Sequence, residues 1–354
     1  MNQLFAERFK SARLMNGFSL QDLSDVLNNK VTRQALHKYE KGEVLPDSEM
    51  MELLCEALNV RPDYFSRETI VEIGVVKFRK LVKYSSKEQN SVIEHTREIL
   101  SRYLELEEIL GIKKVFEHPL PQLEVRNIED VEYFALKLRE KWELGTDPIF
   151  NVSELLEEKN VKVIEFDAED AFDGLQTWVN GKEIPVIVLN KAKFKSKKDR
   201  KRFTAFHELG HLLMPFEENI EEKLEEKFCH RFASAMLLPK DAVIKEFGEK
   251  RNKISIQELG FLKEQYGISI QAIIYRLSDL RIISDSYRNY YYRYINQMGW
   301  KVDEPYEYQG KEESNRFDQL IFRALSEDII SMGKAAALNN MKLSEFRSKT
   351  LMVG

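Results

Sequence analysis

The residues best able to do chemistry lie in one short run, His207-Glu208-Leu-Gly-His211. Residues four apart share one face of a helix, so His207 and His211 can direct their imidazoles at a single metal ion. Glu208 lies one residue further round, where it can take a proton from a zinc-bound water whose pKa the ion has lowered to about 7. The surrounding residues are apolar, which indicates a buried helix, and buried imidazoles and carboxylates need partners. The spacing predicts a zinc centre for hydrolysis. The alternative is a surface helix with two unrelated histidines.

A catalytic zinc ion usually takes three protein ligands, and the next predicted helix offers several candidates. They are Glu221, Glu222, Glu225, Glu226 and His230. Glu225 and Glu226 both border the apolar face of that helix, so periodicity alone does not choose between them. If Glu226 binds the metal, His230 lies one turn further on, where it can hydrogen-bond to a histidine ligand or act on the substrate. His230 as the third ligand is the alternative.

The runs FTAFHELGHLLM (203–214) and EKFCHRFASAMLLP (226–239) resemble the ImmA/IrrE family of metallopeptidases. The resemblance covers about residues 151–283 and is most specific at these two runs. It implies a gluzincin-like site with one zinc ion per chain, in which the glutamate that opens the second run, Glu226, is the third ligand. Cys229 stands where the family usually has Ala, and His230 where it has Asn. The role of His230, as a ligand or in support of the ligands, is therefore open.

Two consecutive helices, predicted at 199–214 and 220–238, must face each other to bring these side chains together. Before them, alternating or apolar runs predict three short strands, at 161–166, 175–179 and 184–189, with an Asn-Gly turn between the last two.

The third strand contains Pro185, which suits an edge strand because proline lacks an amide donor. An extended peptide substrate can pair with such an edge, whereas an ordinary core strand is the alternative. The basic run at 195–202 that precedes the histidine helix is expected to be a solvated face.

A second group of residues at the N-terminus has the pattern of a DNA reader. Ser19 and Thr32 are placed to cap two short helices, and the segments around them resemble the phage-repressor-like (Cro/C1, XRE-type) helix-turn-helix domain. The resemblance implies that Arg33 and Gln34 enter the major groove, where their side chains suit guanine and adenine. The other expected DNA contacts, mainly to phosphates, are Gln21, Thr32, His37, Lys38 and Lys41. A helical protein-interaction domain is the alternative, since the net charge of −5 does not indicate a nucleic-acid binder.

The fold class that we expect is multidomain. An all-α helix-turn-helix domain is predicted at 1–68 and a helical linker at 69–125. An α+β zincin-like (gluzincin) domain with a small sheet follows at 126–283, and an all-α C-terminal region of unknown role at 284–354. An amphipathic helix at 85–110 must bury its apolar stripe, either in a dimer or across the peptidase groove. No internal repeat is evident.

The composition supports a soluble protein. The 354 residues are 43% hydrophobic and 32% charged, and no apolar run approaches the roughly 20 residues of a membrane span. The N-terminus lacks the pattern of a signal peptide. Cys55 and Cys229 are far apart in the sequence and are expected to be reduced thiols, which indicates the cytoplasm.

These patterns predict a regulator that binds a double-stranded DNA operator, as a homodimer, and cleaves a protein. The family resemblance implies that the substrate is a repressor or the product of an adjacent gene, and self-cleavage between Glu68 and Ser85 is a further hypothesis. A rival is a DNA-binding regulator or antitoxin-like protein whose peptidase fold serves sensing or partner binding with little turnover. The complete set of zinc ligands favours the enzyme, because a scaffold need not retain it.

Overall fold

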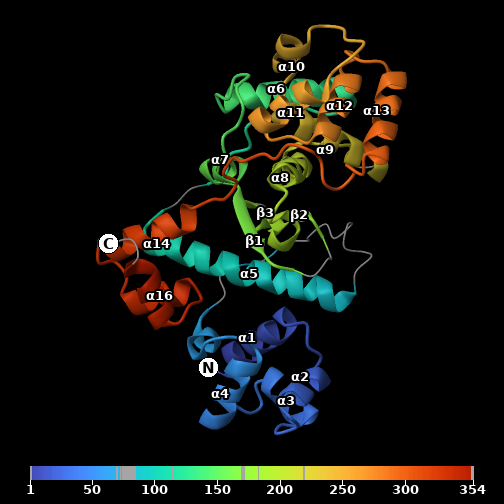
Figure 1. The fold of residues 1–354 in the computed structure, drawn as a ribbon. Helices are drawn as coiled ribbons and strands as arrows, with labels where there is room; N and C mark the ends of the chain where they lie inside the picture. The colour runs from blue at the N-terminus through green and yellow to red at the C-terminus, as the bar shows by residue number, and fades with distance from the viewer. Residues whose placement is uncertain are drawn as a thin grey trace. The chain divides into compact units, whose positions relative to one another are not determined.

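The computed structural model describes residues 2–68, 71, 73, 85–112, 115–168, 172–181, 183–217 and 220–351. The chain divides into two compact units (Figure 1). The first unit comprises Met1–Lys114, Trp178–Lys182 and Asn315–Gly354, and the second comprises Val115–Thr177 and Glu183–Ser314. Within the described residues, no helix is both long enough and apolar enough to pass through a bilayer.

The first unit begins with the predicted helix-turn-helix fold. Its elements are α1 (Asn2–Met15), α2 (Leu20–Val26), α3 (Arg33–Glu40), α4 (Ser48–Ala57) and the 3-10 helix η1 (Pro62–Ser66). Ser19 caps α2 in a reciprocal capping box with Asp22, and the Thr32 side chain accepts a hydrogen bond from the Ala35 amide at the start of α3. Phe9 and Leu36 are fully buried between these helices. The caps and the apolar spacing together confirm the all-α N-terminal fold.

The long helix α5 (Ser86–Ile109) buries its apolar stripe inside the first unit. One part of the stripe packs on α1, and another on α14 (Arg316–Ser326) and α15 (Met332–Leu338), as Figure 1 shows. The nearly buried Glu98 accepts a hydrogen bond from Arg8 at 2.7 Å and pairs also with Arg67. The stripe expected to be buried in a dimer or across the peptidase groove is therefore covered by helices of its own unit.

The second unit consists of helices around a small sheet. Its helices are α6 (Ile128–Lys141), α7 (Val152–Glu158), α8 (Lys198–Leu213), α9 (Glu222–Leu237), α10 (Lys240–Phe247), α11 (Ile256–Tyr266), α12 (Ile270–Asp279) and α13 (Asp285–Gln297). The strands are β1 (Lys162–Phe166), β2 (Gly174–Val179) and β3 (Ile184–Asn190), and β3 is followed by the 3-10 helix η3 (Lys191–Phe194). The last two residues of β2, Trp178 and Val179, are assigned to the first unit. The predicted α+β fold with a small sheet is confirmed.

The strand order is β1-β3-β2, with β1 and β3 parallel. The strand that contains Pro185 is therefore central, and its assignment as the edge strand is wrong. The ladder between β1 and β3 begins at the pair Lys162 and Val186, so Pro185 lies just before it and its missing amide removes none of those bonds. Both strands that flank β3 precede it along the chain, and β2 is the one directly before it.

The basic run before the histidine helix is only partly solvated. Arg202 is fully buried, and it pairs with Glu312 at 2.7 Å and donates to the carbonyls of Gly267 and Ile149. Lys201, 5% exposed, pairs with Glu165. The expectation of a solvated face is wrong for these two residues, because their acidic partners come from distant parts of the chain. The start of α8 is thereby fixed within the core.

Candidate metal centre and nucleic-acid interface

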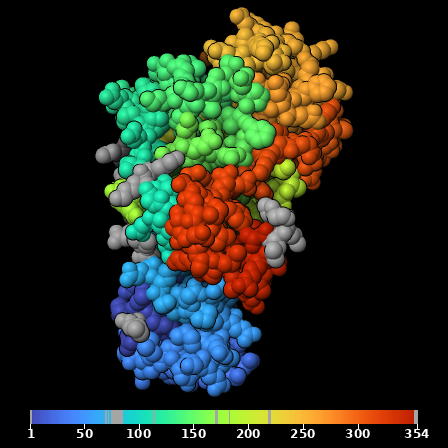
Figure 2. Space-filling model, turned by 90° about the vertical axis from the view of Figure 1, so that its left-hand side faces the viewer, coloured from blue at the N-terminus to red at the C-terminus, as the bar shows by residue number. Residues whose placement is uncertain are grey.

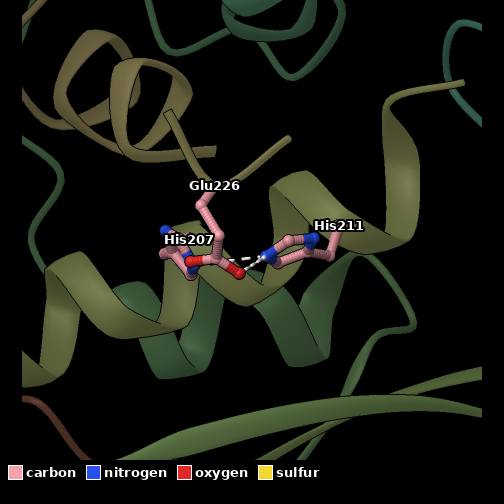
Figure 3. Close-up of side chains that lie close together, drawn as sticks. All are labelled: His207, His211 and Glu226. Atoms are coloured by element: carbon pink, nitrogen blue, oxygen red, sulfur yellow. Dashed lines mark hydrogen bonds and ion pairs between the residues drawn. The ribbon is translucent and has the colours of Figure 1, made fainter. Parts of the chain in front are cut away.

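The candidate metal centre is formed where α8 and α9 pack against each other. Gly210 lies at this contact, and a Cβ atom there would be 3.1 Å from the ring of Phe232 and 3.4 Å from the Cys229 sulfur. The absence of a side chain therefore permits the two helices to approach closely. That approach brings Glu226, on α9, within reach of the histidines on α8 (Figure 3).

Three potential ligand groups converge at this point: His207, His211 and Glu226. The two Nε2 atoms of the histidines are 3.2 Å apart. One carboxylate oxygen of Glu226 lies 3.3 Å from Nε2 of His207, and the other lies 3.2 Å from Nε2 of His211. In a tetrahedral zinc site with bonds of about 2.0–2.1 Å, neighbouring ligand atoms are about 3.3 Å apart. The spacing of these atoms and their donor types fit a zinc ion.

Glu225 contacts His211 at Nδ1, the ring nitrogen that does not face Glu226. Its carboxylate oxygen lies 3.0 Å from Nδ1 of His211, and both side chains are 7% exposed. An imidazole that binds a metal through one nitrogen is commonly fixed through the other by a carboxylate. The structure thus separates the two neighbouring glutamates that the sequence left unresolved. Glu226 lies with the ligand atoms, and Glu225 lies behind His211.

The ring of His211 is in a strongly acidic environment. Burial by itself lowers the pKa of His211, but hydrogen bonds to Cys229, Glu225 and Glu226 together raise that pKa to about 11. In the metal-free chain this imidazole is therefore protonated at neutral pH. For Cys229, burial is the largest influence and raises the pKa of the thiol, which favours the protonated form.

Glu208 is 2% exposed and lies next to the first residue of β2. A Cβ atom on Gly174 would be 2.6 Å from the Thr204 side chain and 3.2 Å from Cγ of Glu208. Glycine is therefore required for β2 to start this close to α8. Sequence reasoning missed Gly174, and the only local signal was a glycine at the start of an apolar run.

His230 lies beside the cluster and not within it. It is exposed, its ring centroid is 4.4 Å from that of His207, and it stacks on Phe203 at 5.8 Å. The three converging ligand groups do not include it. The structure therefore brings His230 to the solvent side of the centre.

The residues predicted to contact DNA lie in the first unit, and all of them are exposed to solvent. Arg33 and Gln34 occupy the first turn of α3, and both are exposed. The remaining candidates, all exposed, are Gln21, Thr32, His37, Lys38 and Lys41. Two of these side chains also have local partners: Thr32 caps α3, and Gln21 donates to Asp25 at 2.8 Å. The arrangement leaves the N-terminal turn of α3 accessible, as groove reading requires.

Comparison with known proteins finds a family model for each of two regions of the chain. Residues 156–278 match a family model described as the IrrE N-terminal-like domain (Peptidase_M78), and residues 9–65 match a helix-turn-helix model. Over 66 residues the chain is 36% identical to the SPbeta prophage-derived uncharacterized HTH-type transcriptional regulator YonR of Bacillus subtilis (strain 168). That similarity covers 19% of this chain and 59% of the relative, so the chain spans under two thirds of the relative's length. The chain therefore joins a region that matches a helix-turn-helix domain to a region that matches the IrrE N-terminal-like peptidase domain.

Proposed function

We propose that the chain is a DNA-binding regulator whose second unit is a zinc-dependent endopeptidase. The observation that carries this proposal is the convergence of His207, His211 and Glu226 at the spacing of a tetrahedral site, with Glu208 buried beside them. A protein that used the fold only for partner binding would not need to keep a carboxylate in this position.

In this proposal, His207, His211 and Glu226 hold one zinc ion, and Glu225 fixes the ring of His211. When bound, the ion would acidify a water molecule and polarise the scissile carbonyl. Glu208 would remove the proton from the attacking water and transfer it to the leaving amine. His230, on the exposed side, would donate a hydrogen bond to the oxygen on which negative charge develops.

The substrate would bind as an extended strand. The start of β2 lies directly beside Glu208, and a peptide that adds to this strand by backbone hydrogen bonds would pass the candidate metal centre. Because the chain also carries a helix-turn-helix domain, we propose a DNA-associated protein as the substrate, such as a repressor or the product of an adjacent gene. The relative from Bacillus subtilis is itself described as a prophage-derived regulator, which is consistent with such a setting.

The test is incubation of the purified full chain, loaded with zinc, with the protein encoded by the adjacent gene. We expect cleavage by the wild type and a loss of at least a hundredfold in rate for Glu208→Gln, at unchanged zinc content, because Glu208 acts as base and not as ligand. Glu222→Gln, which alters an exposed glutamate on α9, is the matched control and should cleave normally. Equal cleavage by Glu208→Gln and the wild type would contradict the proposal.

A further inference from the structure

The C-terminal helices form a small three-helix unit with its own core. α14 contributes Leu320 and Ile321, α15 contributes Ala335 and Ala336, and α16 (Leu343–Leu351) contributes Phe346. All five are at most 2% exposed. The turn between α15 and α16 is four residues long, from 339 to 342. Two short helices joined by a turn of three or four residues, with a preceding helix packed across them, are the elements of a helix-turn-helix.

The C-terminal helices repeat local features of the N-terminal pair α2 and α3. Ser19 and Ser331 cap the first helix of each pair, and both accept a hydrogen bond from the amide three residues later. Five residues after each cap stands a small buried residue, Ser24 in one case and Ala336 in the other.

The turns correspond as well. Nine residues after each cap stands an asparagine, Asn28 or Asn340, with a positive φ of 53°. Asparagine tolerates this left-handed conformation better than most residues, so the sequence marks the same bend twice. Counted from the serine cap, the second helix begins two residues earlier in the C-terminal helices than in the N-terminal ones. The repeat is structural and escapes sequence inspection because only the caps and the turn are shared.

We propose that α14, α15 and α16 form a second helix-turn-helix, in which α16 contacts duplex DNA. α16 occupies the place that α3 occupies in the N-terminal unit, where the second helix of the pair reads the groove. In Figure 2 the red C-terminal helices lie open at the surface on the face turned to the viewer.

The charge of the unit favours DNA as its ligand. Residues 315–354 contain six basic and four acidic residues, a net charge of +2, whereas the whole chain carries −5. Lys342 and Arg347 are exposed at the start and middle of α16. The carboxylate of Glu345 is directed at the helix's own first turn, where it accepts from the Lys342 amide at 3.1 Å. Among the described residues, neither the Lys342 ammonium nor the Arg347 guanidinium forms an ion pair, so both can meet phosphates.

The same surface is poorly suited to a protein partner. Protein interfaces depend on a few aromatic, Arg or large apolar anchors that are buried on binding. Among its described side chains, the exposed face of α16 offers one Arg, Arg347, and one large apolar residue, Leu343, which is 36% exposed. The other exposed side chains include the small polar Ser344 and Ser348, so the face lacks a cluster of anchors. This polar, serine-rich face is typical of contacts with phosphates and base edges.

The two helix-turn-helix parts are held in one unit. The Arg61 guanidinium, just before η1, donates to the Met341 carbonyl in the turn before α16 at 2.5 Å. From α5, Arg102 donates to the Leu338 carbonyl at 3.1 Å, and Glu105 pairs with Lys334. DNA bound by one part would therefore be held close to the other, which raises the effective concentration of the second contact.

The experiment uses the full chain with Arg33→Ala and Gln34→Ala, which remove the expected base contacts of the N-terminal helix-turn-helix. Binding to a fluorescein-labelled 40-base-pair duplex of mixed sequence is followed by anisotropy over a range of salt concentrations. We expect this variant to retain salt-dependent binding. Addition of Lys342→Ala and Arg347→Ala should weaken it at least tenfold and reduce the slope of log K against log salt by about 2, since two phosphate contacts are lost.

Arg323→Ala is the matched control, because this exposed cation lies on α14 and pairs with Glu327. It should leave the binding unchanged. A gain-of-charge variant, Ser344→Lys with Ser348→Lys, keeps the test independent of folding and should strengthen binding. The proposal is overturned if the Lys342 and Arg347 changes have no effect, if Arg323→Ala weakens binding equally, or if the added lysines do not strengthen it. The first of these outcomes would point instead to a protein-docking helix.

Discussion

At the scale of single residues, His211 is contacted by a carboxylate at each ring nitrogen. Glu226 lies at Nε2, and Glu225 lies at Nδ1. The first contact places a ligand oxygen beside a ligand nitrogen. The second fixes the rotation of the ring, so that Nε2 stays directed at the centre.

We predict that Glu225→Ala weakens zinc binding by about 10–100-fold without removing a ligand. Glu225→Gln should retain part of the affinity, because its amide oxygen can still accept from Nδ1. The affinity is measured by competition with a chromophoric chelator, and Glu222→Gln on the same helix is the control. Complete loss of zinc in Glu225→Ala, together with normal zinc in Glu226→Ala, would exchange the roles of the two glutamates.

The raised pKa of His211 predicts proton release on zinc binding. With a pKa of about 11, the ring is protonated in the metal-free chain at pH 8, and the ion must displace that proton. Calorimetry in two buffers of different ionisation enthalpy should report about one proton released from this ring, and affinity should rise about tenfold per pH unit below pH 11. Without metal, the protonated ring stabilises the fold fully below about pH 6.5, and this contribution is lost as the pH rises through 11. Identical heats in the two buffers would contradict this prediction.

At the scale of elements, the close contact of α8 and α9 positions the whole centre. We predict that Gly210→Val destabilises the protein by about 1–3 kcal/mol, because the new side chain meets Phe232, Met214 and Cys229. The zinc affinity should fall as well, since Glu226 moves away with α9. Thermal unfolding and chelator competition measure the two effects.

Gly333→Val is the matched control for Gly210→Val. Gly333 is also a helical glycine, but a Cβ atom there would have only the Ser331 hydroxyl near it, at 3.8 Å. Its effect should stay within about 0.5 kcal/mol. If both variants lost stability equally, the close contact at Gly210 would not be the cause, because valine has a higher helix propensity than glycine.

Much of this arrangement could be predicted from the sequence, because caps, turns and periodicity are local. Ser19, Thr32 and the spacing of His207 and His211 indicated helices that the structure contains. What could not be predicted depends on contacts between distant segments. Helical periodicity did not choose between the neighbours Glu225 and Glu226. The family resemblance implied Glu226 as the ligand, and only the packing of α9 on α8 shows that Glu226 faces the Nε2 atoms while Glu225 contacts Nδ1 of His211.

Two other sequence predictions were wrong for the same kind of reason. The order of the strands is a property of the whole sheet, and the residue pattern of β3 did not contain it. The burial of Arg202 depends on Glu312, which lies 110 residues downstream. In both cases the deciding partner is remote in the chain.

At the scale of the whole molecule, the two activities that we propose share one chain. We predict that operator DNA which carries the substrate accelerates cleavage by the wild type, because tethering raises the effective concentration of the encounter. The full chain with Arg33→Ala, Gln34→Ala, Lys342→Ala and Arg347→Ala, which alters both proposed DNA contacts, should show no such acceleration, while its rate without DNA stays normal. Rates are compared by gel densitometry with and without the operator. Equal acceleration in both chains would exclude a role for tethering.

The structure also bears on the hypothesis of self-cleavage between Glu68 and Ser85. Most of that segment lies outside the described residues. On either side of it, however, Arg8 and Arg67 both pair with Glu98, and α1 packs on α5. A break in this segment would therefore leave the helix-turn-helix domain attached to α5 by non-covalent contacts, so cleavage by itself would not be enough to release it.

The division of the first unit between the two ends of the chain has a consequence for its synthesis. On the ribosome, α5 emerges long before α14 and α15, the helices that cover part of its apolar stripe. Roughly 200 residues separate them, which takes roughly 10–40 s at about 5–20 residues per second. During that interval the nascent chain exposes Tyr103 and Leu106, which the finished protein buries. The second unit ends at Ser314 and can therefore complete its fold before α14 and α15 emerge, whereas this part of the α5 stripe stays uncovered until they do.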